Sequence, residues 1–361
     1  MSNPNQEVKT YETATVKKLP KSSVEIIASI DVATWEKFRG QALKNVNGSI
    51  TIDGFRKGMI PENILIGKVG EAMILEEMAE LALSRAYINI IIDNKIDAIG
   101  KPQVQITKLA KGNPLEFKIV TATVPEVVLP DYKKLAAEEV KKSSPNELEV
   151  TDAHLDEAIL KIRKSHVSHE GHDHKKMSAE EHEKAIMDAL PEFNDDFVRK
   201  LGGEFKDIED FKTKVRVMIG QNKRDEAREK LRIRIADVLV EASKVELPEV
   251  MIESELARTE AQFNSDIERM GVKLDDYLKH AKKTIADLRA DWKPHAEKKA
   301  KLQLILNAIA AKEDLKPDQK EIDTEVSHIV EHYKDADRDR AAVYAETILT
   351  NEKVFQMLEK L

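Results

Sequence analysis

The chain has 361 residues, of which 41% are hydrophobic, 34% charged and 5% aromatic, and its formal net charge is −8. It contains no cysteine, which excludes disulfide stapling and thiol catalysis, and no apolar run approaches the ~18 residues of a membrane span. The N-terminus has no apolar signal core, so we expect a soluble cytoplasmic protein with long solvated helices, divided into roughly two or three domains.

Residues 1–130 are expected to form a small α+β domain. The predicted elements are a strand over Val24–Ile30, a helix closed by Asn47-Gly48, a helix from Pro61 to about Ile91, and strands over Gln103–Leu109 and Leu115–Thr121. The first helix carries apolar residues at spacings of three or four, namely Val32, Trp35, Phe38, Ala42 and Val46. This order of elements is typical of a two-layer domain.

The rest of the chain is expected to be helical. Residues 131–187 predict a linker with one helix over 150–165 and a polar, histidine-rich segment. Residues 188–361 show apolar residues at helical spacing almost throughout, and Leu247-Pro248-Glu249 is typical of a helix start. The predicted fold class is therefore an α+β N-terminal domain followed by an extended all-α C-terminal domain with helical arms.

The most informative motif lies between the two predicted N-terminal helices, in a segment that we call the hook loop (Ile52–Pro61). Its chemistry comes from a short set of residues: Gly54, Phe55, Arg56, Lys57, Gly58 and Pro61. Two glycines permit a tight hook, and the tip combines one apolar ring with two cations that can pair with phosphates or an acidic protein patch. Taken alone, the loop is equally consistent with an interhelix turn whose Phe55 folds back into the core.

The sequence Gly-Phe-Arg-Lys-Gly-x-x-Pro resembles the ribosome-docking signature of the trigger factor family. Further segments resemble that family's domain junctions, namely Pro125–Pro130, Leu190–Phe197 and Val245–Ile252. The resemblance implies that the hook loop docks on the large ribosomal subunit at the exit tunnel, touching protein and rRNA. It also implies an ATP-independent chaperone for nascent polypeptides, without cofactors or membrane contact, that can form homodimers off the ribosome. Met59 departs from the family, since many relatives carry Lys there, which should weaken phosphate contact slightly.

Most members of that family also carry an FKBP-like prolyl isomerase domain, and we expect this chain to lack it. Thr151–Leu190 spans only 40 residues and contains no Phe, Tyr or Trp, so it cannot wall an aromatic pocket. We therefore expect no isomerase activity and no catalytic residues. The segment instead carries His166, His169, His172 and His174, whose spacing matches no closed zinc site and is more typical of a solvated linker than of a metal site.

Alternative functions stay open from the sequence alone. They are a prolyl isomerase-type folding enzyme, a ribosome-independent holdase chaperone and a structural helical scaffold. Adaptable methionines suit a surface that holds varied unfolded chains, and Met218, Met251, Met270 and Met357 are candidates for such a lining or for ordinary core packing. The residues that bind clients cannot be assigned from the sequence.

Overall fold

The computed structural model describes residues 10–143, 148–167, 179–202, 205–333 and 336–361. It divides into two compact units, and each unit is built from two stretches of the chain. The first unit comprises residues 1–129 and 243–308, and the second comprises residues 130–242 and 309–361. Each compact unit thus combines two separate stretches of the chain. The sequence predicts three consecutive segments, 1–130, 131–187 and 188–361.

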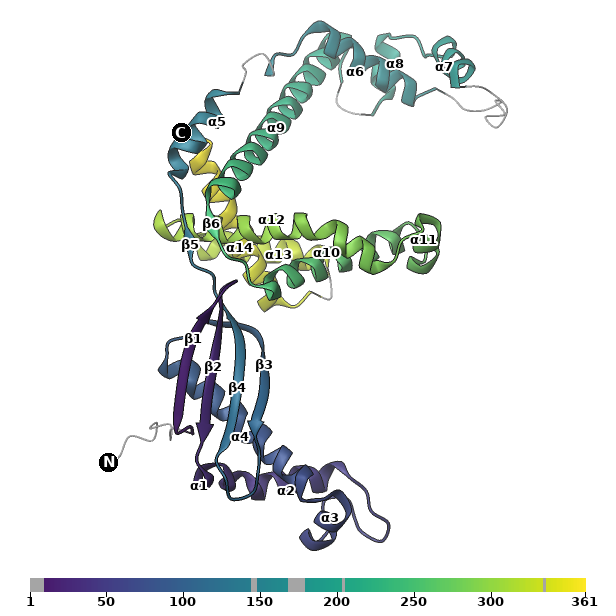
Figure 1. Cartoon of the computed structure of the whole chain (residues 1–361). Helices are drawn as coiled ribbons and strands as arrows, with labels where there is room; N and C mark the ends of the chain where they lie inside the picture. The colour runs from purple at the N-terminus through teal and green to yellow at the C-terminus, as the bar shows by residue number, and fades with distance from the viewer. Residues whose placement is uncertain (1–9, 144–147, 168–178, 203–204, 334–335) are drawn as a thin grey trace. The chain divides into compact units, whose positions relative to one another are not determined.

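The first unit begins with an α+β region whose elements are β1 (Thr13–Leu19), β2 (Ser23–Ile30), α1 (Val32–Trp35), the 3-10 helix η1 (Glu36–Phe38), α2 (Arg39–Ser49), α3 (Glu62–Val69), α4 (Glu71–Asp93), β3 (Ala98–Lys108), β4 (Leu115–Thr123) and β5 (Val127–Val128). Strands β1, β2, β4 and β3 form one antiparallel sheet in that order. Helix α4 crosses one face of the sheet (Figure 1).

Alternation along the two central strands builds the core of this α+β region. Ile26 of β2 pairs with Ile119 of β4, and both side chains are fully buried. They pack in one cluster with Ile74 and Met78 of α4 and with Trp35, whose indole nitrogen donates to the Asn113 carbonyl at 3.0 Å. A strand with every second residue buried and a helix with one apolar face meet in this way because each must cover its hydrophobic side.

The structure corrects three details of the N-terminal prediction. Strand β1 was not predicted, because its sequence is largely polar and it lies at the sheet edge. The predicted helix from Pro61 to Ile91 is interrupted at Gly70, which has a φ of 83° and separates α3 from α4. Asn47-Gly48 does not end the preceding helix, since α2 continues to Ser49.

The first unit also contains residues 243–308, with β6 (Lys244–Val245), α10 (Glu249–Arg269), α11 (Leu274–Ala281) and α12 (Ile285–Lys312) as far as Ala308. The predicted helix start at Leu247-Pro248-Glu249 is confirmed, with Pro248 as the N-cap residue. Helices α10 and α12 pack through Ile252, Leu256 and Ala296, and the Phe263 ring contacts those of Tyr277 and Trp292. Strand β6 pairs with β5, and it is the only strand among the described residues of the C-terminal half.

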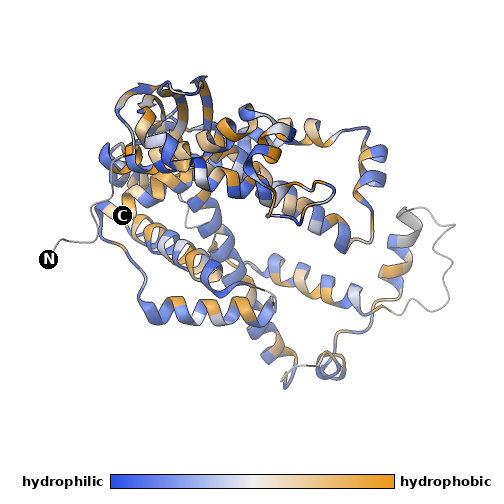
Figure 2. Cartoon of the chain, turned by 90° about the horizontal axis from the view of Figure 1, so that it is seen from below, coloured by the Kyte–Doolittle hydropathy of each residue, from blue (hydrophilic) through white to orange (hydrophobic). Residues whose placement is uncertain are grey.

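The second unit is helical in the part of the chain that the structure describes. Its helices are α5 (Tyr132–Lys141), α6 (Asp152–Ser165), α7 (Ala179–Asp188), α8 (Asp195–Lys200), α9 (Ile208–Ala242), α13 (Gln319–His332) and α14 (Arg338–Leu358). Hydrophobic and hydrophilic residues alternate along the helical ribbons of the chain, as expected of amphipathic helices (Figure 2). The predicted α+β N-terminal region and helical C-terminal region are thus confirmed.

An ion-pair network joins α9 to α14. The Arg232 guanidinium donates to both carboxylate oxygens of Glu352 at 2.7 and 2.8 Å and also pairs with Glu359, while Arg228 pairs with both glutamates. Arg232 also lies over the Phe355 ring, 5.4 Å from its centroid. The hydrogen bonds from Arg232 lower the pKa of Glu352 from 4.5 to about 2.

This network predicts acid sensitivity of the second unit. Because the folded-state pKa of Glu352 is depressed, its stabilising contribution is present above pH 4.5 and is lost as the pH falls toward 2. We expect Glu352→Gln to lower the free energy of unfolding by about 1–2 kcal/mol near neutral pH, allowing for solvent screening, and to flatten the loss of stability on acidification. Urea unfolding at several pH values measures both effects.

Glu346→Gln on the same helix is the matched control, because Glu346 is exposed and outside this network. We expect it to change stability by less than about 0.5 kcal/mol. If the free energy of unfolding of Glu352→Gln depended on pH in the same way as that of the parent chain, the network would not stabilise the fold.

Candidate functional site: the loop between α2 and α3

The hook loop, Ile52–Pro61, connects α2 to α3 through two tight turns. The Phe55 amide donates to the Ile52 carbonyl at 3.1 Å, and the Met59 amide donates to the Arg56 carbonyl at 2.9 Å. Gly54 and Gly58 have φ values of 87° and 81°. No atom lies within 4 Å of where a Cβ would stand at either position, so the glycines serve backbone conformation rather than close packing.

Asn47, near the end of α2, holds the base of the hook loop. Its side-chain Nδ2 donates to the Ile60 carbonyl at 2.7 Å, and its Oδ1 accepts from the Ile60 amide at 3.1 Å. The Asn47 carbonyl also accepts from the Gly58 amide at 3.2 Å. One residue of α2 therefore fastens the returning arm of the loop, and the buried Ile60 side chain packs into the N-terminal core.

The tip of the loop separates its apolar and charged groups. The Phe55 ring is half-buried and packs against the N-terminal core, so it neither projects freely from the apex nor lies fully inside. Arg56 and Lys57 are exposed, and neither has an ion-pair partner among the described residues. The conformation is intermediate between the two readings that the sequence left open. The two cations are available to a partner. Only part of the Phe55 ring is exposed.

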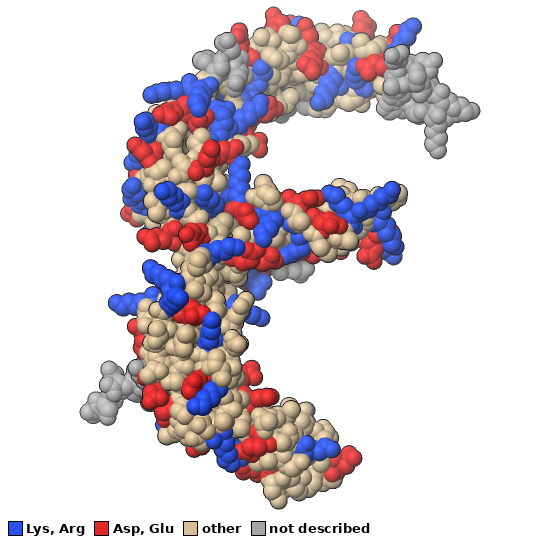
Figure 3. All heavy atoms as spheres, viewed as in Figure 1, with Lys and Arg blue, Asp and Glu red and all other residues tan. Residues whose placement is uncertain are grey.

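The loop and the helices that follow it also expose apolar side chains. Met59 is 72% exposed, and Ile64 of α3 and Met73 of α4 are also exposed. On the face shown in Figure 3, uncharged atoms cover most of the end of the α+β region that carries α3. A shallow cleft of about 230 Å³ lies beside the loop, lined by Leu43, Lys44, Asn47, Gly58, Ile60, Glu62 and Leu65. The loop therefore offers charge and apolar contact together.

The charges at the starts of α2, α3 and α4 are paired within the domain. Arg39 pairs with Glu71 at 2.7 Å and with Glu62 at 3.1 Å, and Lys111 approaches Glu71 at 3.5 Å. The hydrogen bond from Arg39 holds the pKa of Glu71 below its ordinary value. These pairs link the starts of α3 and α4 to α2. They distinguish a structural arginine, Arg39, from the unpaired Arg56.

The histidine-rich segment is described only at its start. His166 caps the end of α6, with Nδ1 3.0 Å from the Ile162 carbonyl and its ring edge-on to Phe197. His169, His172 and His174 lie outside the described residues. Within the described residues, no group of three or more His, Cys, Asp or Glu side chains is arranged to hold a metal ion.

The methionines that were candidates for a client-binding lining divide into two pairs. Met218 of α9 is 50% exposed and Met270, just after α10, is 74% exposed. Met251 and Met357 are half-buried. None of the helices that the structure describes is both long and apolar enough to cross a membrane.

Sequence reasoning singled out the hook residues as candidates but missed Asn47, which holds the base of the loop. The glycines and the Phe-Arg-Lys tip form a contiguous pattern, whereas Asn47 acts across the loop on a residue 13 positions away. The available signal was an amide side chain one turn before a glycine-rich loop. That signal also fits an ordinary helix terminus, which is how we interpreted it.

Comparison with known proteins matches both halves of the chain to one family. A family model described as "Bacterial trigger factor protein (TF)" matches residues 12–162, and one described as "Bacterial trigger factor protein (TF) C-terminus" matches residues 207–358. The trigger factor of Moorella thermoacetica is 24% identical over 89% of this chain and 87% of its own length. That of Carboxydothermus hydrogenoformans is 25% identical over 89% and 91%.

The fold is likewise similar to a solved trigger factor structure, from work on promiscuous substrate recognition in folding and assembly by that chaperone. The match covers 97% of this chain and 99% of the other, with a TM-score of 0.54 and 17% sequence identity. Two family models that together span most of the chain, and relatives aligned over nearly their whole length, agree with the fold. The chain therefore belongs to the trigger factor family of ribosome-associated chaperones.

Proposed function

We propose that this chaperone docks on the large ribosomal subunit beside the nascent-chain exit tunnel through its hook loop, and there shields emerging polypeptides without ATP. The observation that carries the docking proposal is the pair of exposed, unpaired cations, Arg56 and Lys57, on a loop fastened by Asn47. A fixed loop loses little conformational entropy on binding, so its contacts contribute more fully to affinity.

The two cations suit a surface of rRNA phosphates and acidic protein side chains. Arg56 can form paired hydrogen bonds with a phosphate or carboxylate, and Lys57 can act as a mobile point charge. The exposed part of Phe55, together with Met59, adds apolar contact with a ribosomal protein. Because the exposed Met59 adds apolar surface beside the two cations, we infer that apolar contact contributes to docking together with phosphate contact.

We further propose that exposed apolar residues on the helices hold unfolded clients. Met270 and Val272 lie at the turn between α10 and α11, and Val343, Tyr344 and Ile348 lie on α14. Scattered flexible side chains of this kind repack around varied partners. Release would then follow client folding and weak affinity, without a cofactor. The proposal assigns the chain to the cytoplasm, where it can dimerise when it is not bound to a ribosome.

The docking proposal predicts that Phe55→Ala/Arg56→Ala/Lys57→Ala weakens ribosome binding by at least about tenfold, because each charge-assisted hydrogen bond contributes about 1.5–3 kcal/mol. Co-sedimentation with ribosomes at several salt concentrations measures this. For each cation that contacts a phosphate, the slope of log affinity against log salt should fall by about one.

Lys17→Ala/Lys37→Ala is the matched control, because both lysines are exposed in the same α+β region and lie outside the hook loop. This control removes two positive charges, as the hook variant does. It should bind ribosomes as tightly as the parent chain. Equal co-sedimentation of the hook variant and the control would refute docking through this loop. That result would place ribosome contact on another surface, whereas no co-sedimentation of the parent chain would favour a ribosome-independent holdase.

We also propose that the chain has no prolyl isomerase activity. The two family models leave residues 163–206 unmatched, and Thr151–Leu190 contains no Phe, Tyr or Trp to wall an aromatic pocket. The proline-limited phase of a refolding client, which takes about 10–100 s, should therefore keep its rate when the chain is added. An FKBP-type isomerase is the positive control. Acceleration in proportion to the concentration of the chain would contradict the proposal and assign it an enzymatic role.

A further inference from the structure

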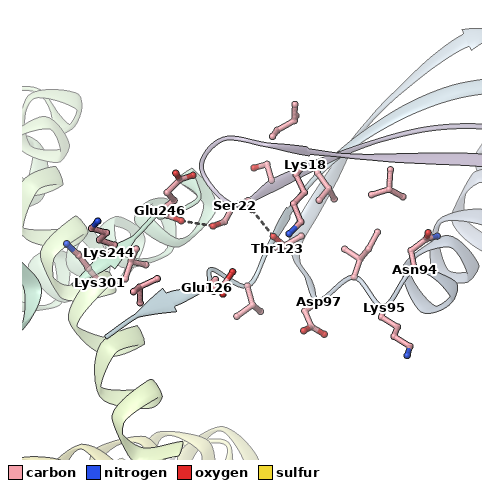
Figure 4. Close-up of a pocket in the computed structure, with 18 of the residues that line it drawn as sticks. Lys18, Ser22, Asn94, Lys95, Asp97, Thr123, Glu126, Lys244, Glu246 and Lys301 are labelled. Atoms are coloured by element: carbon pink, nitrogen blue, oxygen red, sulfur yellow. Dashed lines mark hydrogen bonds between the residues drawn. The ribbon is translucent and has the colours of Figure 1, made fainter. Parts of the chain in front are cut away.

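A groove of about 790 Å³ lies in the first unit and contains no hook-loop residue. Figure 4 shows its walls, which come from the turn between β1 and β2, the loop after α4, the β4–β5 segment, the β6 segment and α12. Lys18, Lys95, Lys244 and Lys301 line it. None of these four lysines has an ion-pair partner among the described residues.

Part of the groove has the periodicity of an extended chain. Val124, Glu126 and Val128 line it and are exposed, whereas the intervening Pro125 is buried. Val124 and Val128 are 52% and 57% exposed, which is high for valines. A segment that presents every second side chain matches the two-residue period of an extended peptide lying beside it.

The balance of free charge in the groove is positive. Of its three carboxylates, that of Glu246 accepts a hydrogen bond from the Lys21 amide at 3.0 Å. The Glu246 carbonyl accepts from the Ser22 hydroxyl at 2.8 Å, the contact drawn in Figure 4. These contacts leave the charge of Glu246 in place, so four lysines face three carboxylates, a formal net charge of +1.

A buried hydroxyl adds an independent sign of a missing partner. Ser243 lines the groove and is only 3% exposed, yet its Oγ has no hydrogen-bond partner among the residues that the structure describes. Buried polar groups are almost always paired, so this donor is suited to the carbonyl or carboxylate of a ligand after a small local adjustment.

We propose that this groove binds an extended, acidic polypeptide segment in which carboxylates alternate with aliphatic side chains. The aliphatic groups would contact Val124 and Val128, and the carboxylates would face the lysines. Nucleic acid fits less well, because the lining contains neither arginine nor an aromatic ring on which a base could stack. This inference rests on the proposed shielding of unfolded clients and names one class of client segment, but it does not depend on docking through the hook loop.

The probe is a fluorescein-labelled peptide of roughly ten alternating valine and glutamate residues. The comparison peptide has lysine in place of each glutamate. Fluorescence anisotropy with the full chain measures both. We expect the acidic peptide to bind at least about tenfold more tightly than the basic one, a difference of about 1.4 kcal/mol. Lys244→Glu/Lys301→Glu should lower the affinity for the acidic peptide at least about tenfold.

The matched control is Lys273→Glu/Lys282→Glu, which makes the same charge change at exposed residues outside the groove and should leave peptide affinity unchanged. The groove variant should also keep parental ribosome co-sedimentation, so failure here is distinguishable from failure of the docking proposal. Equal binding of the two peptides, or an unchanged affinity of the groove variant, would overturn the inference. Displacement of the acidic peptide by single-stranded RNA, with RNA binding lost in the groove variant, would instead assign the groove to nucleic acid.

Discussion

Three hydrogen bonds made by Asn47 set the conformation of the loop on which the proposed function depends. Its side-chain amide both donates to and accepts from Ile60, and its carbonyl accepts from Gly58. A loop with two glycines at positive φ would otherwise sample many conformations, at a cost of about 1–2 kcal/mol for each residue ordered on binding. Fastening its base to α2 converts a flexible connection into a preformed binding element.

The rest of the α+β region supports that element. Ile60 and the half-buried Phe55 ring join the cluster in which the sheet packs against α4, and the Arg39–Glu71 pair fixes the start of α4. Arg56 and Lys57 are left without partners in the described structure. Charges that stabilise the domain are thus kept apart from charges available to a partner.

Much of this could be predicted from the sequence, because its signals were local. The alternation in Val24–Ile30, the apolar face around Trp35 and the Gly-Phe-Arg-Lys-Gly tip each lie within one short segment. What was missed depends on distant partners. Strand β1 is polar and exists because it pairs with β2, and β5 pairs with β6 more than a hundred residues along the chain. The Asn47 contacts and the half-burial of Phe55 likewise follow from tertiary packing, which no periodicity encodes.

The most direct test of the account is the ribosome affinity of Asn47→Asp, measured by co-sedimentation. Aspartate has nearly the same shape, but as a carboxylate it cannot donate to the Ile60 carbonyl, so the loop should loosen while Phe55, Arg56 and Lys57 stay unchanged. We predict an affinity loss of about tenfold, with the far-UV circular dichroism spectrum of the parent chain retained. Parental affinity in Asn47→Asp would contradict the claim that a preformed loop conformation carries ribosome docking.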